Sequence, residues 1–344
     1  MKALVYTAPG RVEIQQRPEA IAGAGEVLVR VAVTGICGSD VHGFLGKSAR
    51  RKPGLVLGHE SIGVVAAARP ESGAAGSALL TKRVAINPLM SCMRCDACAA
   101  GRHNVCSSWR LLGLDSISGA FADFVAVPLR NVTPLPDSVS DAEAVMIEPL
   151  ANAVHLVAHA PVHAGLYPTA VIYGGGTLGA ATLAIARARG IRVLALVEVN
   201  PLRGKVAGEL GAERVLNPKT TDVPAEILKI TGGRGVDLAL DAVGMETTRL
   251  GCAACVTRGG SVLLLGLDHG PTTFDFMDLI RREVRLQCSY GYSEKDFAAA
   301  VDFVARKVVN FTRWTDVLPL SEGQRAFEKL VKDPGDRLKI ALTP

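Results

Sequence analysis

The sequence is poor in aromatic residues and has no run of charges of one sign. Phe, Tyr and Trp together make up 5% of its 344 residues. The 38 Lys and Arg and the 33 Asp and Glu, which give a formal net charge of +5, are scattered along the chain. Nucleic-acid-binding proteins generally concentrate basic residues on an arm or patch. The composition therefore gives no support to a nucleic-acid partner.

The chain also lacks a long apolar segment. No stretch approaches the roughly 20 consecutive apolar residues that a membrane-spanning helix needs. The first residues, MKALVYTAPGRVEI, alternate in the manner of a β-strand and contain no apolar signal core. We therefore expect a cytoplasmic protein with no membrane partner. In such a reducing compartment the eight cysteines are not expected to form disulfides.

Glycine is abundant, with 36 residues, and two patterns divide the chain. Up to about residue 130, short strands are punctuated by glycine and proline. From about Asp141, apolar strands alternate with amphipathic helices, which predicts an α/β fold with a doubly wound parallel sheet, the Rossmann fold. We expect a β-rich domain at residues 1–150, an α/β domain at 151–287 and a C-terminal segment at 288–344.

A glycine motif marks the predicted cofactor site. The apolar segment VIY is followed by Gly174, Gly176 and Gly179 in G-x-G-x-x-G spacing, with Thr177 and Leu178 at the start of the next helix. Gly174 would permit the tight turn, Gly176 would let the backbone approach a pyrophosphate, and Gly179 would allow close packing of helix on strand. A glycine-rich turn without a ligand is the alternative interpretation.

An acidic residue follows the motif at the distance that dinucleotide binding requires. Glu198 ends the next apolar strand, 19 residues beyond Gly179, where a carboxylate would bind the adenosine ribose and repel a 2′-phosphate. Two charges about 4 Å apart interact by roughly 4 kcal/mol at an effective dielectric near 20, so NAD is favoured over NADP. Arg203 is also assigned to the cofactor site, and its charge weakens the discrimination.

Four cysteines form the most specific local pattern in the chain. Cys92, Cys95, Cys98 and Cys106 are spaced C-x2-C-x2-C-x7-C. Four thiolates complete the tetrahedral shell of zinc and leave no open position for a substrate. The pattern therefore predicts a structural zinc. An iron–sulfur cluster or unligated thiols are the alternatives, but the spacing lacks the bacterial cluster form.

Two further motifs connect the chain to a known family. The segments GICGSDVH (35–42) and GHESIG (58–63), the cysteine loop, Glu148-Pro149, the glycine motif and Glu198 occur in the order found in the zinc-containing medium-chain alcohol dehydrogenases. The chain resembles that family over essentially its whole length. It looks closest to the sorbitol (polyol) and threonine dehydrogenase branch. The resemblance implies a GroES-like catalytic domain, to which residues 288–344 return, and a Rossmann domain that binds NAD.

The resemblance also implies a catalytic zinc. Cys37 thiolate and neutral His59 are apt ligands, and one carboxylate would bring the ligand charge to −2. Glu60 and Glu148 are both candidates for that carboxylate, and one could replace the other during turnover. Adjacent residues of a regular strand point to opposite faces, so His59 and Glu60 can bind one metal only where the chain bends.

A proton relay completes the set of residues implied by the resemblance. Ser39 would take the proton of the alcohol, and His42 would receive it by way of the cofactor ribose. The expected reaction is oxidation of a secondary alcohol of a polyol or sugar-derived, possibly phosphorylated, substrate by NAD, giving the ketone. Oxidation of threonine or butanediol and an inactive nucleotide-binding homologue are the alternatives. A homodimer or homotetramer is expected by resemblance alone.

Overall fold

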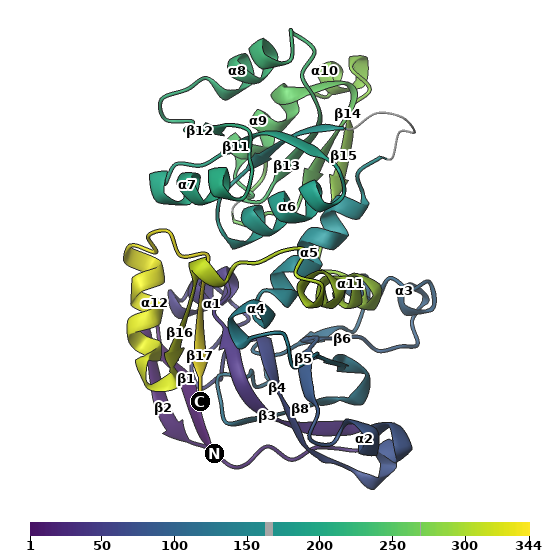
Figure 1. Cartoon of the computed structure of the whole chain (residues 1–344), viewed down its shortest axis with the longest axis vertical. Coiled ribbons are helices and arrows are strands. Elements are labelled where there is room, and N and C mark those ends of the chain that lie inside the picture. The colour runs from purple at the N-terminus through teal and green to yellow at the C-terminus, as the bar shows by residue number, and fades with distance from the viewer. Residues whose placement is uncertain (162–167, 269) are drawn as a thin grey trace. The chain divides into compact units, whose positions relative to one another are not determined.

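The computed structural model describes residues 1–161, 168–268 and 270–344. These residues form two compact units (Figure 1). Unit 1 comprises Met1–Glu148 and Ser293–Pro344, and unit 2 comprises Pro149–Tyr292. Within the described ranges, no helix combines the length and the apolar character needed to cross a membrane.

Unit 1 is built on a seven-stranded sheet in the order β16-β17-β3-β4-β5-β9, with β8 paired to β3. The strands of unit 1, which include the separate pairs β1-β2 and β6-β7, are β1 (Lys2–Ala8), β2 (Arg11–Gln16), β3 (Glu26–Gly35), β4 (Glu60–Ala68), β5 (Arg83–Ile86), β6 (Leu89–Met90), β7 (Arg110–Leu111), β8 (Phe124–Pro128), β9 (Val132–Pro134), β16 (Thr315–Pro319) and β17 (Lys339–Thr343). Its helices are α1 (Gly38–Phe44), α2 (Gly73–Leu79), α3 (Asp96–Ala99), α4 (Asp141–Ala144), α11 (Glu294–Ala305) and α12 (Gly323–Lys332).

Strand β17 joins the two chain segments of unit 1. It runs antiparallel to β3, with Ala341 opposite Gly35, and parallel to β16. Apolar side chains of β1, β17 and α12 share a core with Phe44 and Phe121, and their burial fixes the position of the late strand. The pairing brings the first residue of β17 beside the end of β3, where the residues of the predicted metal site begin.

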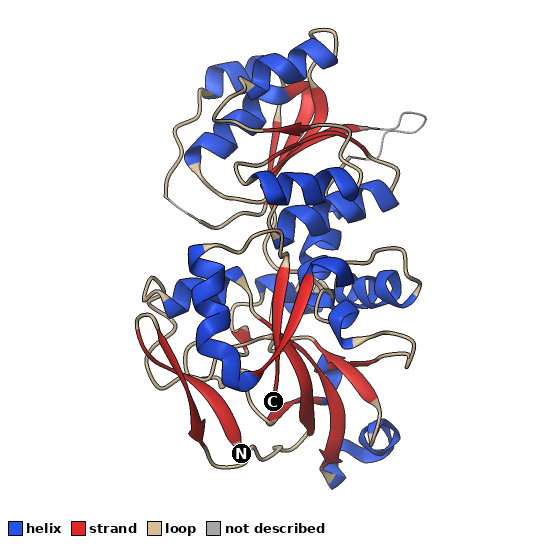
Figure 2. Cartoon of the chain, turned by 60° about the vertical axis from the view of Figure 1, so that its left-hand side comes forward, coloured by secondary structure: helices blue, strands red, loops and turns tan. Residues whose placement is uncertain are grey.

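Unit 2 contains a parallel six-stranded sheet in the order β12-β11-β10-β13-β14-β15. Numbered along the chain, this is the 3-2-1-4-5-6 order of a doubly wound nucleotide-binding fold, and helices cover both faces (Figure 2). Its strands are β10 (Thr169–Tyr173), β11 (Arg192–Val197), β12 (Val215–Leu216), β13 (Val236–Asp241), β14 (Val256–Leu264) and β15 (Arg285–Cys288). The helices are α6 (Thr177–Ala188), α7 (Pro201–Glu209), α8 (Val223–Ile230), α9 (Glu246–Cys255) and α10 (Phe276–Arg281), and α5 (Ile147–Ala158) leads in from unit 1.

The strands of this sheet are buried on both sides, which explains their continuous apolar sequences. Residues 170–173 of β10 and 193–197 of β11 are all buried. The α/β fold expected from the sequence, which combines a Rossmann sheet with a β-rich domain, is confirmed.

Candidate functional site

Three residues of unit 1 bring metal-binding atoms close together. One donor atom each of Cys37, His59 and Glu60 lies within 4.8 Å of the other two. Cys37 caps the N-terminus of α1 in an extended conformation, while Glu60 is the first residue of β4 and pairs with Gly35 of β3. His59 and Glu60 are 3% and 2% exposed, so the cluster is screened from bulk water. A thiolate, an imidazole and a carboxylate form a donor set that suits zinc.

A glycine turn lets the adjacent residues His59 and Glu60 face the same point. Gly58 has φ +94°, which lies in the left-handed region, and β4 begins only at Glu60. A Cβ at Gly58 would also lie 2.8 Å from Phe121 Cγ and 2.9 Å from Thr34 Cγ2. The chain therefore bends where the sequence required a bend. On the neighbouring strand, Gly35 leaves the space that the Glu60 carboxylate occupies.

A lysine from the end of the chain binds both oxygens of Glu60. Lys339 Nζ donates to Glu60 Oε1 at 2.8 Å and to Oε2 at 2.6 Å, and it donates to the Ile36 carbonyl at 3.1 Å. Burial by itself would lower the pKa of Lys339, but the charges of Glu60 and Cys37 outweigh burial and raise it. Lys339 is not predicted from the sequence, because nothing local to DRLKIALTP indicates a buried cation.

Asp40 is the buried partner of His59. Its Oδ1 lies 3.4 Å from His59 Nδ1 and 3.7 Å from Arg51 Nε, and its Oδ2 accepts from the Cys37 N–H at 3.1 Å. Burial would raise the pKa of Asp40, but the charges of His59 and Arg51 and the Cys37 N–H lower it to about 2. A carboxylate at Nδ1 orients the ring and leaves Nε2 for a metal. Asp40, too, is not predicted as a site residue from the sequence.

The remaining predicted residues of unit 1 lie on α1 and at the start of α5. Ser39 and His42 are three residues apart on α1, so both point to one side of the helix. Ser39 Oγ accepts from Arg51 Nη2 at 3.0 Å. Glu148 is the second residue of α5 and is outside the group of three close donors, but its charge raises the pKa of Lys339.

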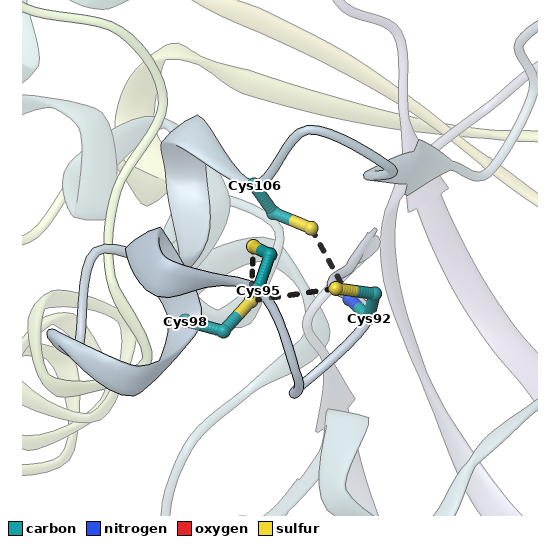
Figure 3. A group of neighbouring side chains, drawn as sticks. All are labelled: Cys92, Cys95, Cys98 and Cys106. Atoms are coloured by element: carbon teal, nitrogen blue, oxygen red, sulfur yellow. Dashed lines mark hydrogen bonds between the residues drawn. The ribbon is translucent and has the colours of Figure 1, made fainter.

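The four-cysteine loop brings its thiols together without disulfides. The sulfurs of Cys92, Cys95, Cys98 and Cys106 all lie within 4.8 Å of one another (Figure 3). Two pairs are closer, with Cys95 Sγ 3.5 Å and Cys92 Sγ 3.9 Å from Cys98 Sγ. The N–H groups of Cys98 and Ser107 lower the pKa of Cys95 to about 6, which favours the ligating thiolate. This donor set fits a closed tetrahedral zinc site.

The glycine motif of unit 2 adopts the conformation that its spacing predicts. Gly174 follows β10 with φ +100°, and Gly176 caps α6, which starts with Thr177 and Leu178. A Cβ at Gly179 would overlap the Gly174 carbonyl, so this glycine allows the helix to pack on the turn. A Cβ at Gly176 would meet only Arg203 Nη1, at 3.9 Å. Open space at the N-terminus of α6 fits the pyrophosphate of a dinucleotide.

Glu198 lies directly beside this loop. Its Oε2 accepts from the Gly175 N–H at 2.6 Å, and its Oε1 accepts from the Asn200 N–H at 2.8 Å. These bonds hold the carboxylate against the glycine turn, and each oxygen keeps a lone pair for a ribose hydroxyl. Arg203, in the first turn of α7, brings its guanidinium to the same loop.

Two family models match the chain. One lies within unit 1, and most of the other lies in unit 2. The model described as "Alcohol dehydrogenase GroES-like domain" matches residues 23–137. The model described as "Zinc-binding dehydrogenase" matches residues 177–306.

Known proteins resemble the chain over most or all of its length. It is 31% identical to a sorbitol dehydrogenase of Bacillus subtilis, an alignment that covers 100% of this chain and 97% of that protein. It is 34% identical to an L-threonine 3-dehydrogenase of Pyrococcus horikoshii over 81% of this chain and 80% of that protein. Among solved structures, the alcohol dehydrogenase rspB of Escherichia coli, complexed with NADH, superposes with a TM-score of 0.91 at 26% identity, covering 100% and 99% of the two chains.

Proposed function

The chain belongs to the zinc-binding alcohol dehydrogenases, and from this premise we propose that it oxidises a secondary alcohol of a polyol or sugar-derived substrate to the ketone, with NAD as hydride acceptor. One observation carries the proposal: unit 1 holds an incomplete donor set of Cys37, His59 and Glu60 in addition to a closed set of four cysteines. A closed zinc site has a structural role, whereas an open one keeps a position for substrate. The polyol substrate is supported by the sorbitol dehydrogenase relative, which aligns over the whole chain.

The chain's own residues divide the work of the reaction. Cys37, His59 and a carboxylate would hold the catalytic zinc, and Asp40 would keep the His59 ring oriented through Nδ1. Zinc would polarise the alcohol hydroxyl and lower its pKa, and NAD would accept the hydride from the alcohol carbon. Ser39 would accept the hydroxyl proton, and His42 would pass it to solvent. The loop from Gly174 to Gly179, with Glu198 and Arg203, would bind NAD.

Glu60 and Glu148 are proposed to alternate as the third protein ligand. Glu60 accepts hydrogen bonds from Lys339 at both oxygens, and the charge of Glu148 raises the pKa of the same lysine. Both carboxylates therefore act on the charge of Lys339, Glu60 through hydrogen bonds and Glu148 through its charge, which supports two carboxylates in the neighbourhood of one metal site. Zinc-loaded crystal structures with and without an alcohol test this exchange. One unchanged set of ligands in both structures would rule it out.

A panel of alcohols tests the proposed function directly. NADH formation is measured with zinc-loaded protein on sorbitol and other polyols, polyol phosphates, butanediol and threonine, with and without a chelator. We expect turnover of at least one polyol or polyol phosphate and loss of that turnover on chelation. Turnover of threonine alone would establish the amino-acid alternative. No turnover of any alcohol would favour an inactive nucleotide-binding homologue.

For quaternary structure we propose a homodimer formed through unit 2. Strand β15 lies at one edge of its sheet, and α10, which precedes it in the chain, exposes 60% of Phe276 and 71% of Ile280. A second copy of β15 would extend the sheet across a two-fold axis and cover these apolar side chains. Light scattering on wild type and Ile280→Asp tests this. A dimer is expected to become monomeric in the variant, and a monomeric wild type would contradict the proposal.

The proposed location is the cytoplasm. All eight cysteines are free, and the zinc sites depend on reduced thiols, which a reducing compartment preserves.

A further inference from the structure

Arg51 is a buried arginine that contacts the predicted proton relay. It lies in the segment between α1 and β4 and is 7% exposed. Its Nη2 donates to Ser39 Oγ at 3.0 Å, and its Nε lies 3.7 Å from Asp40 Oδ1. The adjacent Arg50, by contrast, is exposed and pairs with Asp115 at 2.6 Å. Two neighbouring arginines therefore have entirely different surroundings.

The fold makes room for Arg51 at a specific position of α1. Gly43 is buried in this helix, and a Cβ there would lie 3.1 Å from Arg51 Cβ and still closer to Arg51 Cδ. The side chain of Arg51 thus crosses the helix where α1 has no side chain. Burying a guanidinium is costly unless an anion compensates it, and the fully buried Asp40 provides that anion. Neither Gly43 nor Arg51 belongs to the group of close donor atoms.

The chemistry of the guanidinium determines the direction of the Ser39 hydrogen bond. Arginine has five N–H donors, has no acceptor and stays protonated. Ser39 Oγ must therefore accept from Arg51, which uses one of its two lone pairs. In the part of the chain that the structure describes, the Ser39 hydroxyl forms no hydrogen bond to a protein acceptor. One O–H and one lone pair of Ser39 are left for groups that are not part of the protein.

We propose that Arg51 is a positioning residue, which holds Ser39 Oγ so that its free lone pair receives the alcohol proton and its own O–H donates onward. This inference rests on the proposed function, because it assigns Arg51 to the same proton relay. A hydroxyl has one proton and two lone pairs, and a relay uses the proton and one of the lone pairs. The N–H of Arg51 occupies the second lone pair, which restricts the orientation of the hydroxyl. A donor that cannot accept occupies it without reversing the direction of transfer. The substrate side of Ser39 is thereby fixed by a residue that acts through Ser39.

A double-mutant cycle tests the coupling between Arg51 and Ser39. The value of kcat/KM for the alcohol is measured for wild type, Arg51→Met, Ser39→Ala and the double variant. We expect Arg51→Met to lower kcat/KM about tenfold or more, since misplacing a reacting group by about 1 Å can cost a hundredfold. In the Ser39→Ala background the same substitution is expected to change kcat/KM less than about twofold, because the positioned hydroxyl is gone. An equal loss in both backgrounds would overturn the proposal.

Two further variants separate positioning from folding. Arg51→Lys keeps a cation beside Asp40, so we expect it to fold, to bind the wild-type amount of zinc and to recover only part of the lost activity. Full wild-type activity of Arg51→Lys would overturn the proposal, because charge alone would then suffice. Arg50→Met is the matched control at the neighbouring exposed arginine and is expected to keep wild-type kcat/KM.

A structural measurement keeps the test independent of turnover. If wild type oxidises no alcohol, the proposed function fails, and crystal structures of zinc-loaded wild type and Arg51→Lys still test the positioning. We expect Ser39 to change rotamer or to occupy two rotamers in the variant. A single, unchanged Ser39 rotamer would overturn the role of Arg51 in either case.

Discussion

Lys339 Nζ lies 2.8 and 2.6 Å from the two carboxylate oxygens of Glu60, although 279 residues separate the two in the sequence. Both side chains are 1% exposed. The third N–H of Lys339 is directed to the Ile36 carbonyl, so the ammonium group is fully hydrogen-bonded. The pair therefore neutralises a buried acid next to the predicted catalytic metal.

Replacing this lysine is expected to destabilise unit 1 strongly. Lys339→Met leaves Glu60 buried without a cation, which typically costs about 3–5 kcal/mol. Denaturant unfolding of zinc-free protein followed by Trp fluorescence measures the effect, because both tryptophans, Trp109 and Trp314, belong to unit 1. The Lys339→Met/Glu60→Gln double variant is expected to recover most of the loss. Lys329→Met, at an exposed pair with Asp316, should cost less than about 1 kcal/mol.

The two donor sets are expected to bind zinc independently. Wild type should hold one zinc ion per donor set. Cys37→Ser should lose the catalytic zinc alone, with alcohol oxidation falling more than about a hundredfold. Cys98→Ser should lose the structural zinc and lower the thermal midpoint. Metal analysis of each purified variant gives the stoichiometry, and Cys288→Ser, at an exposed cysteine, is the control. Full activity of Cys37→Ser would refute the assigned site.

A single methyl group at Gly176 should weaken cofactor binding without affecting the fold. Gly176 has φ −73° and open space at its Cβ position, so alanine fits the free protein. Bound pyrophosphate would meet the added methyl, and we expect the Kd for NADH to rise about tenfold. Calorimetric titration with NADH measures this. Gly208→Ala, on α7, is the matched control with unchanged NADH affinity. An unchanged Kd in Gly176→Ala would place the phosphates elsewhere.

The negative charge of Glu198 is expected to select NAD. Glu198→Gln removes the charge while keeping an acceptor oxygen beside the loop. The ratio of kcat/KM with NADP to that with NAD should rise about tenfold. Expressed as a free energy, this change is less than half of the interaction of roughly 4 kcal/mol expected for two charges about 4 Å apart. Glu209→Gln removes an exposed charge at the end of α7 and should leave the ratio unaltered. An unchanged ratio in Glu198→Gln would assign the selectivity to other residues.

Asp237 should make the stability of unit 2 depend on pH at the acidic end. Burial would raise its pKa, but hydrogen bonds from Arg234 and Thr169 lower it to about 2. The folded-state pKa is thus below the unfolded value of about 3.9, so the stabilisation is complete above pH of about 4 and is lost as the pH falls towards 2. Because the Asp237 side chain is 31% exposed and solvent screens its charge, we expect its ionised form to stabilise unit 2 by only about 1–2 kcal/mol.

Calorimetric unfolding of wild type and Asp237→Asn checks this dependence. The difference between the two should be largest near pH 6 and should shrink below pH of about 4. A difference that stays constant with pH would show that the Asp237 charge is not involved.

Local patterns in the sequence were enough to predict several parts of the molecule. The glycine motif specifies a turn whose conformation depends on residues within it, and Gly174 and Gly179 adopt the predicted geometry. The cysteine spacing likewise brings four thiols together within one short loop. That zinc binds there, and at Cys37, His59 and Glu60, stays a prediction for metal analysis.

Residues that act through long-range packing could not be predicted in this way. Lys339 reaches Glu60 only because β17 pairs with β3, and strand alternation does not specify the partner of a strand. Arg51 follows Arg50 in a basic segment whose sequence indicates solvent-exposed side chains. Only the fold shows that Arg51 is buried while Arg50 is exposed. Gly43 is a local feature that points to a close neighbour of α1, because a glycine inside a helix often has a packing role.

The late arrival of β17 has a consequence for biosynthesis. A ribosome adds about 5–20 residues each second, so Lys339 follows Glu60 by roughly 15–60 s. All of unit 2 is synthesised within that interval. During this interval Lys339, the partner of Glu60, has not yet been synthesised. The apolar surface of the first segment that β17 and α12 cover in the folded protein is also still exposed. Unit 2 can therefore complete its fold before unit 1. Until β17 is synthesised, the first segment of unit 1, Met1–Glu148, stays incompletely folded and accessible to chaperones and proteases.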